Sequence, residues 1–106
     1  MKFNSDKAFK QLMNHGIVAT MRFNRYRKLG KWHLPFYARG VIVVITRHGR
    51  AVGEGIVIDV VPNTKKNREK YLHLSGFKSV EEWEQEARRL HRGRLPNSIV
   101  IVRLLR

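Results

Sequence analysis

The stretch that decides the fold is residues 41–61, which read VIVVITRHGRAVGEGIVIDVV. Residues 41–46 consist of Val, Ile and Thr, a composition typical of a buried strand. His48-Gly49-Arg50 then predicts a turn, and residues 51–61 predict a second strand in which Gly53 and Gly55 indicate a bulge or bend. The two strands form a predicted hairpin around which the rest of the chain packs.

Downstream of the hairpin, the sequence predicts a helix and a final strand. Ser79 caps the helix, and Glu82 follows at the spacing of a capping box, in which each side chain bonds the other residue's backbone N–H. Trp83, Ala87 and Leu90 then recur at helical spacing. Residues 65–70, between hairpin and helix, predict a charged turn or short helix, and residues 99–105 predict the last strand.

Upstream of the hairpin, we expect a helix, a strand and a long loop. Asn4 or Ser5 caps the helix, and Gly16 is a suitable stop because glycine readily adopts the left-handed conformation. Residues 17–22 alternate as a strand does. Residues 23–35 mix cations with aromatics without a clean period, which predicts a loop, partly helical at most. This order of elements favours an α+β domain, a small β-barrel or curled sheet with helices at its ends.

Length and composition limit the classes of protein that this chain can belong to. Its 106 residues, 42% of them apolar, suit a single domain over residues 1–106 with its own core. The absence of Cys excludes a disulfide framework and a cysteine nucleophile. The longest apolar run, residues 41–45, is far below the roughly 20 residues that span a bilayer. We expect a cytoplasmic protein without a cofactor. We also expect no bound metal, because no two His have metal-ligand spacing.

Charge is the strongest functional signal in the sequence. The chain carries 22 Lys and Arg against 8 Asp and Glu, a formal net charge of +14. Residues 7–53 hold ten basic residues and no carboxylate, whereas the later half holds seven of the eight acids. Such self-repulsion is relieved by a polyanion, and nucleic acid is the commonest one. An anionic membrane surface is the weaker alternative, because no strongly amphipathic basic helix supports it.

Two stretches resemble the ASCH domain family, a branch of the PUA-like β-barrel superfamily. The first is residues 12–22, a helix end, a glycine and a strand closing in Thr20-Met21-Arg22. The second is residues 76–83, Gly-Phe-Lys-Ser-Val-Glu-Glu-Trp, followed by a helix and an apolar last strand. The resemblance implies a small PUA-like β-barrel with helices at the barrel ends, a cleft, and RNA or modified-nucleoside ligands.

The same resemblance implies candidate catalytic residues. Some bacterial members hydrolyse an acetylated cytidine amide with a Lys, a Thr and a Glu, and others have been linked to RNA cleavage. By matching motifs, the Thr falls on Thr20 and the Glu on Glu69, while the Lys position holds Ile17. An apolar residue cannot supply the cationic group, so this hypothesis needs Lys28 or Lys31 to reach the site.

Our leading hypothesis from the sequence is an RNA-binding domain, with DNA left open as a ligand and the oligomeric state undetermined. Arg and Lys would hold phosphates, and Tyr26 or Trp32 would stack on an unpaired base of a single-stranded or flexible ligand. Three segments would rim one basic cleft. The predicted nucleic-acid contacts are Arg22, Arg25, Tyr26, Arg27, Lys28, Lys31, Trp32, Arg47, Arg50, Lys65, Lys66, Arg68 and Lys70. The alternative hypothesis is a hydrolase acting on RNA or a modified nucleoside, centred on Thr20 and Glu69.

Overall fold

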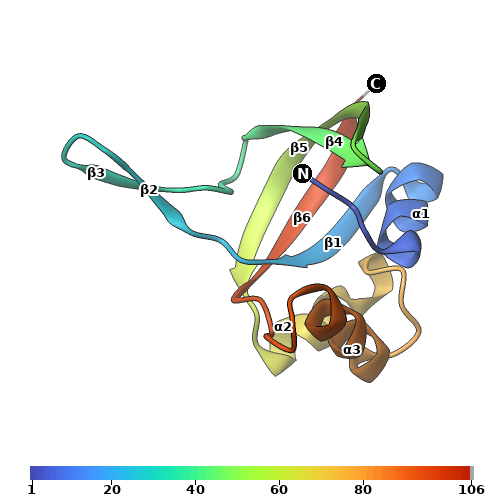
Figure 1. Cartoon of the computed structure of the whole chain (residues 1–106). Coiled ribbons are helices and arrows are strands. Elements are labelled where there is room, and N and C mark those ends of the chain that lie inside the picture. The colour runs from blue at the N-terminus through green and yellow to red at the C-terminus, as the bar shows by residue number, and fades with distance from the viewer. Residues whose placement is uncertain (106) are drawn as a thin grey trace.

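The fold is α+β, as the sequence predicts, with a four-stranded sheet, a separate two-stranded sheet and three α-helices (Figure 1). The computed structural model describes residues 1–105, and the side chains of all of these except Arg27 and Leu29. In chain order the elements are α1 (Asp6–His15), β1 (Ile17–Arg22), β2 (Tyr26–Leu29), β3 (Trp32–Pro35), β4 (Ile42–Arg47), β5 (Arg50–Pro62), α2 (Lys65–Tyr71), the short 3₁₀ helix η1 (Leu72–Leu74), α3 (Val80–Leu90) and β6 (Ser98–Leu105).

The main sheet is antiparallel and open. Its strand order is β1-β6-β5-β4, so β1 and β4 lie at opposite edges, and the predicted barrel closure is wrong. The chain before α1 lies beside β4, where Lys2 pairs in parallel with Thr46. Ser5 then caps α1, its hydroxyl accepting a hydrogen bond from the backbone N–H of Ala8.

The predicted hairpin is β4 and β5, and β5 has one irregularity beside a glycine, in its pairing with β4, and a second one further on, in its pairing with β6. The register skips Val52 and Ile58, each of which is an extra residue in β5. Gly55 has a different role, because a Cβ atom there would lie 2.7 Å from the Val102 side chain on β6. The glycine thus permits a close approach of neighbouring strands.

Apolar side chains cover both faces of the sheet. One core cluster includes Phe3 and Leu12, with α1 packed over it. The other cluster, on the opposite face, includes Trp83 and Ala87 of α3. Residues 99–102 of β6 contribute alternately to the two clusters, which explains why this strand is apolar without interruption.

Polar side chains start the helices, as expected, but the capping box at α3 is only half formed. The Ser79 hydroxyl accepts a hydrogen bond from the Glu82 backbone N–H at 3.1 Å. The Glu82 carboxylate instead forms an ion pair with Lys7 of α1. The predicted return bond is replaced by a contact that ties α3 to α1.

The predicted loop at residues 23–35 is a β-hairpin, formed by β2 and β3 with the two-residue turn Gly30-Lys31. Gly30 has a φ of 61°, which a tight hairpin turn requires and glycine supplies without strain. This hairpin, residues 26–35, projects from the rest of the molecule (Figure 1), and we call it the arm. Its described side chains from residue 26 to 34 are exposed, so no buried face exists to impose the apolar alternation that predicts a strand.

Candidate functional site

The arm exposes large aromatic side chains among cations. Tyr26 is 70% exposed and Trp32 is 72% exposed. In the register, Tyr26 lies opposite Pro35 and Lys28 opposite His33, so these residues share one face. Trp32 belongs to the other face, two positions from Leu34. Each face of the arm thus offers a ring on which a base can stack.

Exposed cations flank these rings. They are Lys28 and Lys31 on the arm, Arg25 just before it and Arg39 just after it. Within the described part of the chain, none of the four forms an ion pair with a carboxylate. Arg27 was predicted to contribute as well, and its side chain lies outside the described residues. The described cations are available to an external anion.

The base of the arm is fixed by asparagine side chains. The Asn24 amide accepts from the Tyr37 backbone N–H at 2.8 Å and donates to the Tyr37 carbonyl at 2.9 Å. Asn97, from the turn before β6, accepts from the Asn24 backbone N–H and donates to the Asn24 carbonyl. These four hydrogen bonds join both strands of the arm to the main sheet.

Two predicted nucleic-acid contacts are structural residues instead. Arg47 is largely buried: it donates to the Phe3 carbonyl and forms an ion pair with Asp6. Arg68 is also largely buried: it bonds Asn63 and forms an ion pair with Glu84 of α3 at 2.7 Å. Both guanidiniums are largely buried and already bonded to oxygen atoms of the protein, which makes these arginines structural.

The three cationic segments do not converge on one cleft, and that prediction is wrong. Arg50 begins β5, whereas Lys65, Lys66 and Lys70 lie on α2, which follows the other end of β5 (Figure 1). The whole length of β5, thirteen residues, separates the two groups. These four side chains are exposed, but they lie at opposite ends of the sheet.

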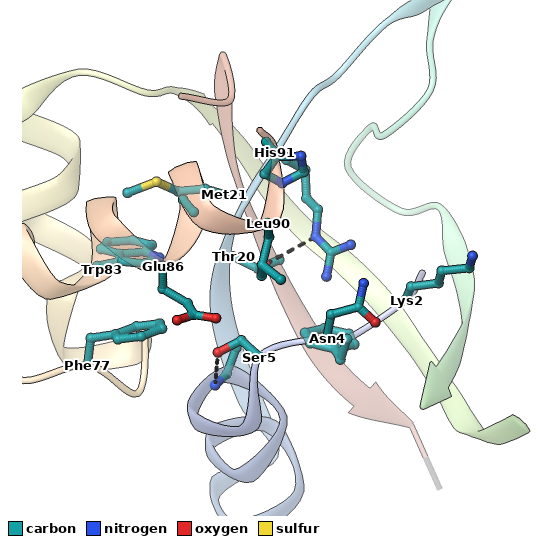
Figure 2. A pocket seen from close by; sticks show the side chains of 14 residues that line it. Lys2, Asn4, Ser5, Thr20, Met21, Phe77, Trp83, Glu86, Leu90 and His91 are labelled. Carbon is teal, nitrogen blue, oxygen red and sulfur yellow. Dashed lines mark hydrogen bonds between the residues drawn. The ribbon is translucent and has the colours of Figure 1, made fainter. Parts of the chain in front are cut away.

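A pocket of about 230 Å³ lies between β1, the N-terminal segment and α3 (Figure 2). From α3 it receives a face of residues at helical spacing, which includes Trp83, Leu90 and Glu86. The full lining is Lys2, Phe3, Asn4, Ser5, Ala8, Thr20, Met21, Arg22, Phe77, Trp83, Glu86, Ala87, Leu90 and His91.

Arg22 and Thr20 share this pocket, as their alternation on one strand face predicts. Arg22 Nε donates to Thr20 Oγ1 at 3.1 Å. The Arg22 guanidinium also lies over the Phe3 ring, 4.9 Å from its centroid. The arginine is thereby held in one orientation, with its terminal nitrogens left for other contacts.

The surroundings of Arg22 are electropositive. Burial lowers the pKa of the Arg22 guanidinium below its ordinary value. Burial, and then the charge of Arg22, lower the pKa of the Met1 amino group. Burial, followed by the charges of Arg22 and Arg94, lowers the pKa of His91. His91 is therefore neutral at pH 7, and the charges nearest this end of the pocket are positive.

The two candidate catalytic residues do not meet in this pocket. Thr20 lines it, but Glu69 is exposed on α2 and does not. Lys28 and Lys31, the proposed substitutes for the missing lysine, are on the arm and are also outside the lining. The pocket carboxylate is Glu86, which sequence reasoning missed, and which pairs with Arg89. The sequence does contain a signal that Glu86 lines the pocket: it follows Trp83 by three residues, and this spacing puts both side chains on one face of the helix.

Neither a metal centre nor a membrane-spanning helix is found in residues 1–105. No group of three or more His, Asp or Glu in this range is arranged to hold a metal ion. Each helix described there is too short or too polar to cross a bilayer.

Comparisons with known proteins give one informative relative. It is "Uncharacterized protein 105" of Sulfolobus islandicus rod-shaped virus 1, with 35% identity over 96 residues, which cover 90% of this chain and 81% of the viral protein. No protein-family model and no solved structure matches the chain. The alignment thus relates most of one chain to most of the other.

Proposed function

The chain belongs to the same family as this protein of Sulfolobus islandicus rod-shaped virus 1. From the surface of the chain itself, we propose that it binds nucleic acid through the arm. The preferred ligand is RNA in a single-stranded or flexible form. The observation that carries the proposal is the exposure of Tyr26 and Trp32 among cations without carboxylate partners.

Physical chemistry connects this surface with an unpaired strand. Exposed aromatic rings stack on bases whose faces are free. The bases of a duplex are stacked on one another, so their faces are not free. Lys28 and Lys31 supply the charge that holds the sugar-phosphate backbone. The two-stranded arm is narrow and only four residue pairs long, so a single RNA strand can contact both of its faces.

We also propose that the chain is related to PUA-like domains. Both stretches that resemble the ASCH family contribute to the pocket: the first supplies Thr20 and Arg22, and the second supplies Phe77 and Trp83. This meeting of segments from distant parts of the sequence supports kinship, although the sheet is open.

The test is a binding panel read by tryptophan fluorescence. Trp83 is only 3% exposed, so quenching by an added oligonucleotide reports mainly on Trp32. We expect single-stranded RNA to quench the fluorescence more strongly than duplex RNA, duplex DNA or single-stranded DNA of matched composition. Trp32→Ala should weaken binding by about 5- to 150-fold, corresponding to a stacked base worth about 1–3 kcal/mol.

A matched pair of variants separates stacking from misfolding. Trp32→Phe keeps a ring, so it should retain most of the affinity, measured by anisotropy of a labelled oligonucleotide, while losing the quenching signal. Met13→Ala removes an exposed apolar side chain from α1 and should change nothing. Equal affinity of wild-type and Trp32→Ala protein would contradict the proposed role of the arm.

The hydrolase alternative is tested with the same materials. Incubation with labelled RNA and with acetylated cytidine should give no product if the protein only binds. Turnover that disappears in Thr20→Ala would make the pocket catalytic and would replace this proposal.

A further inference from the structure

Arg22 holds a positive charge that the described protein does not neutralise. Its Nε bonds Thr20, but its two terminal nitrogens have no hydrogen-bond partner among the described residues. Neither nitrogen is among the fully buried atoms without a partner, and Arg22 lines the pocket. A half-buried guanidinium without a counter-charge is costly, and an anion that enters the pocket removes that cost.

The other charges in and around the pocket determine at which end an anion binds. Lys2 lies on one side. Burial and then the charge of Arg22 lower the pKa of both the Met1 ammonium and His91, so these groups lie near Arg22. Glu86 lies on the opposite side, near Phe77 and Trp83 (Figure 2). The Glu86 carboxylate is paired with Arg89, so the uncompensated positive charge lies at the Arg22 end and attracts an anionic group there.

The shape of the pocket selects the kind of anion. Between its charged ends the lining is largely apolar and includes Met21, Trp83 and Leu90. A phosphate inside a strand carries two flanking sugars, and both would have to enter the cavity of about 230 Å³. A terminal phosphate has one ester substituent, so it can reach a recessed guanidinium with its nucleoside against the apolar wall.

We propose that the pocket binds the terminal phosphate monoester of a nucleic-acid strand, with the phosphate on Arg22 and Thr20 and the terminal nucleoside against α3. This inference rests on the proposed function and extends it, because the arm then holds the strand while the pocket holds its end. Guanidinium binds phosphate oxygens through two parallel N–H groups, and the free terminal nitrogens of Arg22 are suited to this.

The experiment compares one short RNA in three forms: with a 5′-phosphate, with a 3′-phosphate and with hydroxyls at both ends. We expect about tenfold tighter binding of one phosphorylated form, and which form it is identifies the end. Arg22→Gln should abolish the preference, so that all three forms of the RNA bind with the same affinity. Lys10→Ala, an exposed cation on α1, is the matched control and should keep the preference.

A second measurement does not depend on any variant. Adenosine monophosphate should raise the melting temperature of the wild-type protein, and adenosine should not. If all three RNAs bind equally and the monophosphate has no effect, the pocket proposal is overturned while binding by the arm stands. If no RNA binds but the monophosphate stabilises the protein through Arg22, the pocket stands and the proposed function of the arm fails.

Discussion

The salt dependence of RNA binding can be worked out from the charges on and around the arm. Its four described, unpaired cations are Arg25, Lys28, Lys31 and Arg39. If each neutralises one phosphate of a single strand, the logarithm of the association constant falls with the logarithm of salt concentration at a slope of about −2.8. Affinity should then decrease by about 50-fold between about 50 and 200 mM salt.

The double variant Lys28→Ala/Lys31→Ala tests this number directly. It removes two of the four contacts, so the slope should fall to about −1.4 and the loss over the same salt range to about 7-fold. Fluorescence anisotropy of a labelled single-stranded RNA, titrated at several salt concentrations, gives both slopes. Lys10→Ala serves as the control, since it removes a cation from α1 rather than from the arm.

Two outcomes would refute this reasoning. A wild-type slope near zero would mean that binding releases no counterions, and the electrostatic role of the arm would be wrong. A slope of the expected size that the double variant leaves unchanged would place the phosphate contacts elsewhere, for example on α2.

Three further predictions concern stability and arm order. Because folding lowers the pKa of His91, the unfolded chain gains a proton below about pH 6.5 that the folded chain resists. The melting temperature should therefore fall as pH decreases from about 7 to 5, and parallel curves for wild type and His91→Gln would contradict this. Gly76→Ala should lose at least about 1–3 kcal/mol in urea unfolding, since φ is 87° and a Cβ atom would lie 2.4 Å from the Lys7 carbonyl oxygen. Gly93→Ala, with a φ of 85° and open space, should cost less, and equal losses would remove the clash as the cause. Asn24→Ala should lower the fluorescence anisotropy of the arm tryptophan while changing the melting temperature little, and an unchanged anisotropy would show that other contacts fix the arm.

The sequence predicted most of the main sheet and its helices because these elements have a buried side. Residues 99–102 are apolar because neighbours cover both faces of β6, and Ser79 signals the start of α3 through its cap. Residues 41–46 were predicted to form a buried strand, but this is correct for one face only: Val43 and Ile45 are buried, whereas Ile42 and Val44 are about half exposed. The arm escaped prediction because both of its faces are solvated, which removes the periodicity that distinguishes a strand from a loop.

The candidate site was predictable only in part. Local alternation was sufficient to place Thr20 and Arg22 together. The structural roles of Arg47 and Arg68 depend on Asp6 and Glu84, which lie far away in the sequence, so no local pattern distinguishes these arginines from free cations. The expected single cleft failed for a similar reason, since strand length, rather than charge, decides how far apart the cationic groups lie.

The described side chains of the arm bury almost no surface, so its sequence is hardly constrained by the core. Substitutions at Tyr26, Lys28, Lys31 or Trp32 remove no core contact, so the sheet and helices tolerate them. Its shape is maintained by the β2–β3 pairing, the asparagine anchors and the turn glycine. If the arm binds nucleic acid as we propose, substitutions on it can change the ligand preference of this protein without compensating changes in the body that carries it.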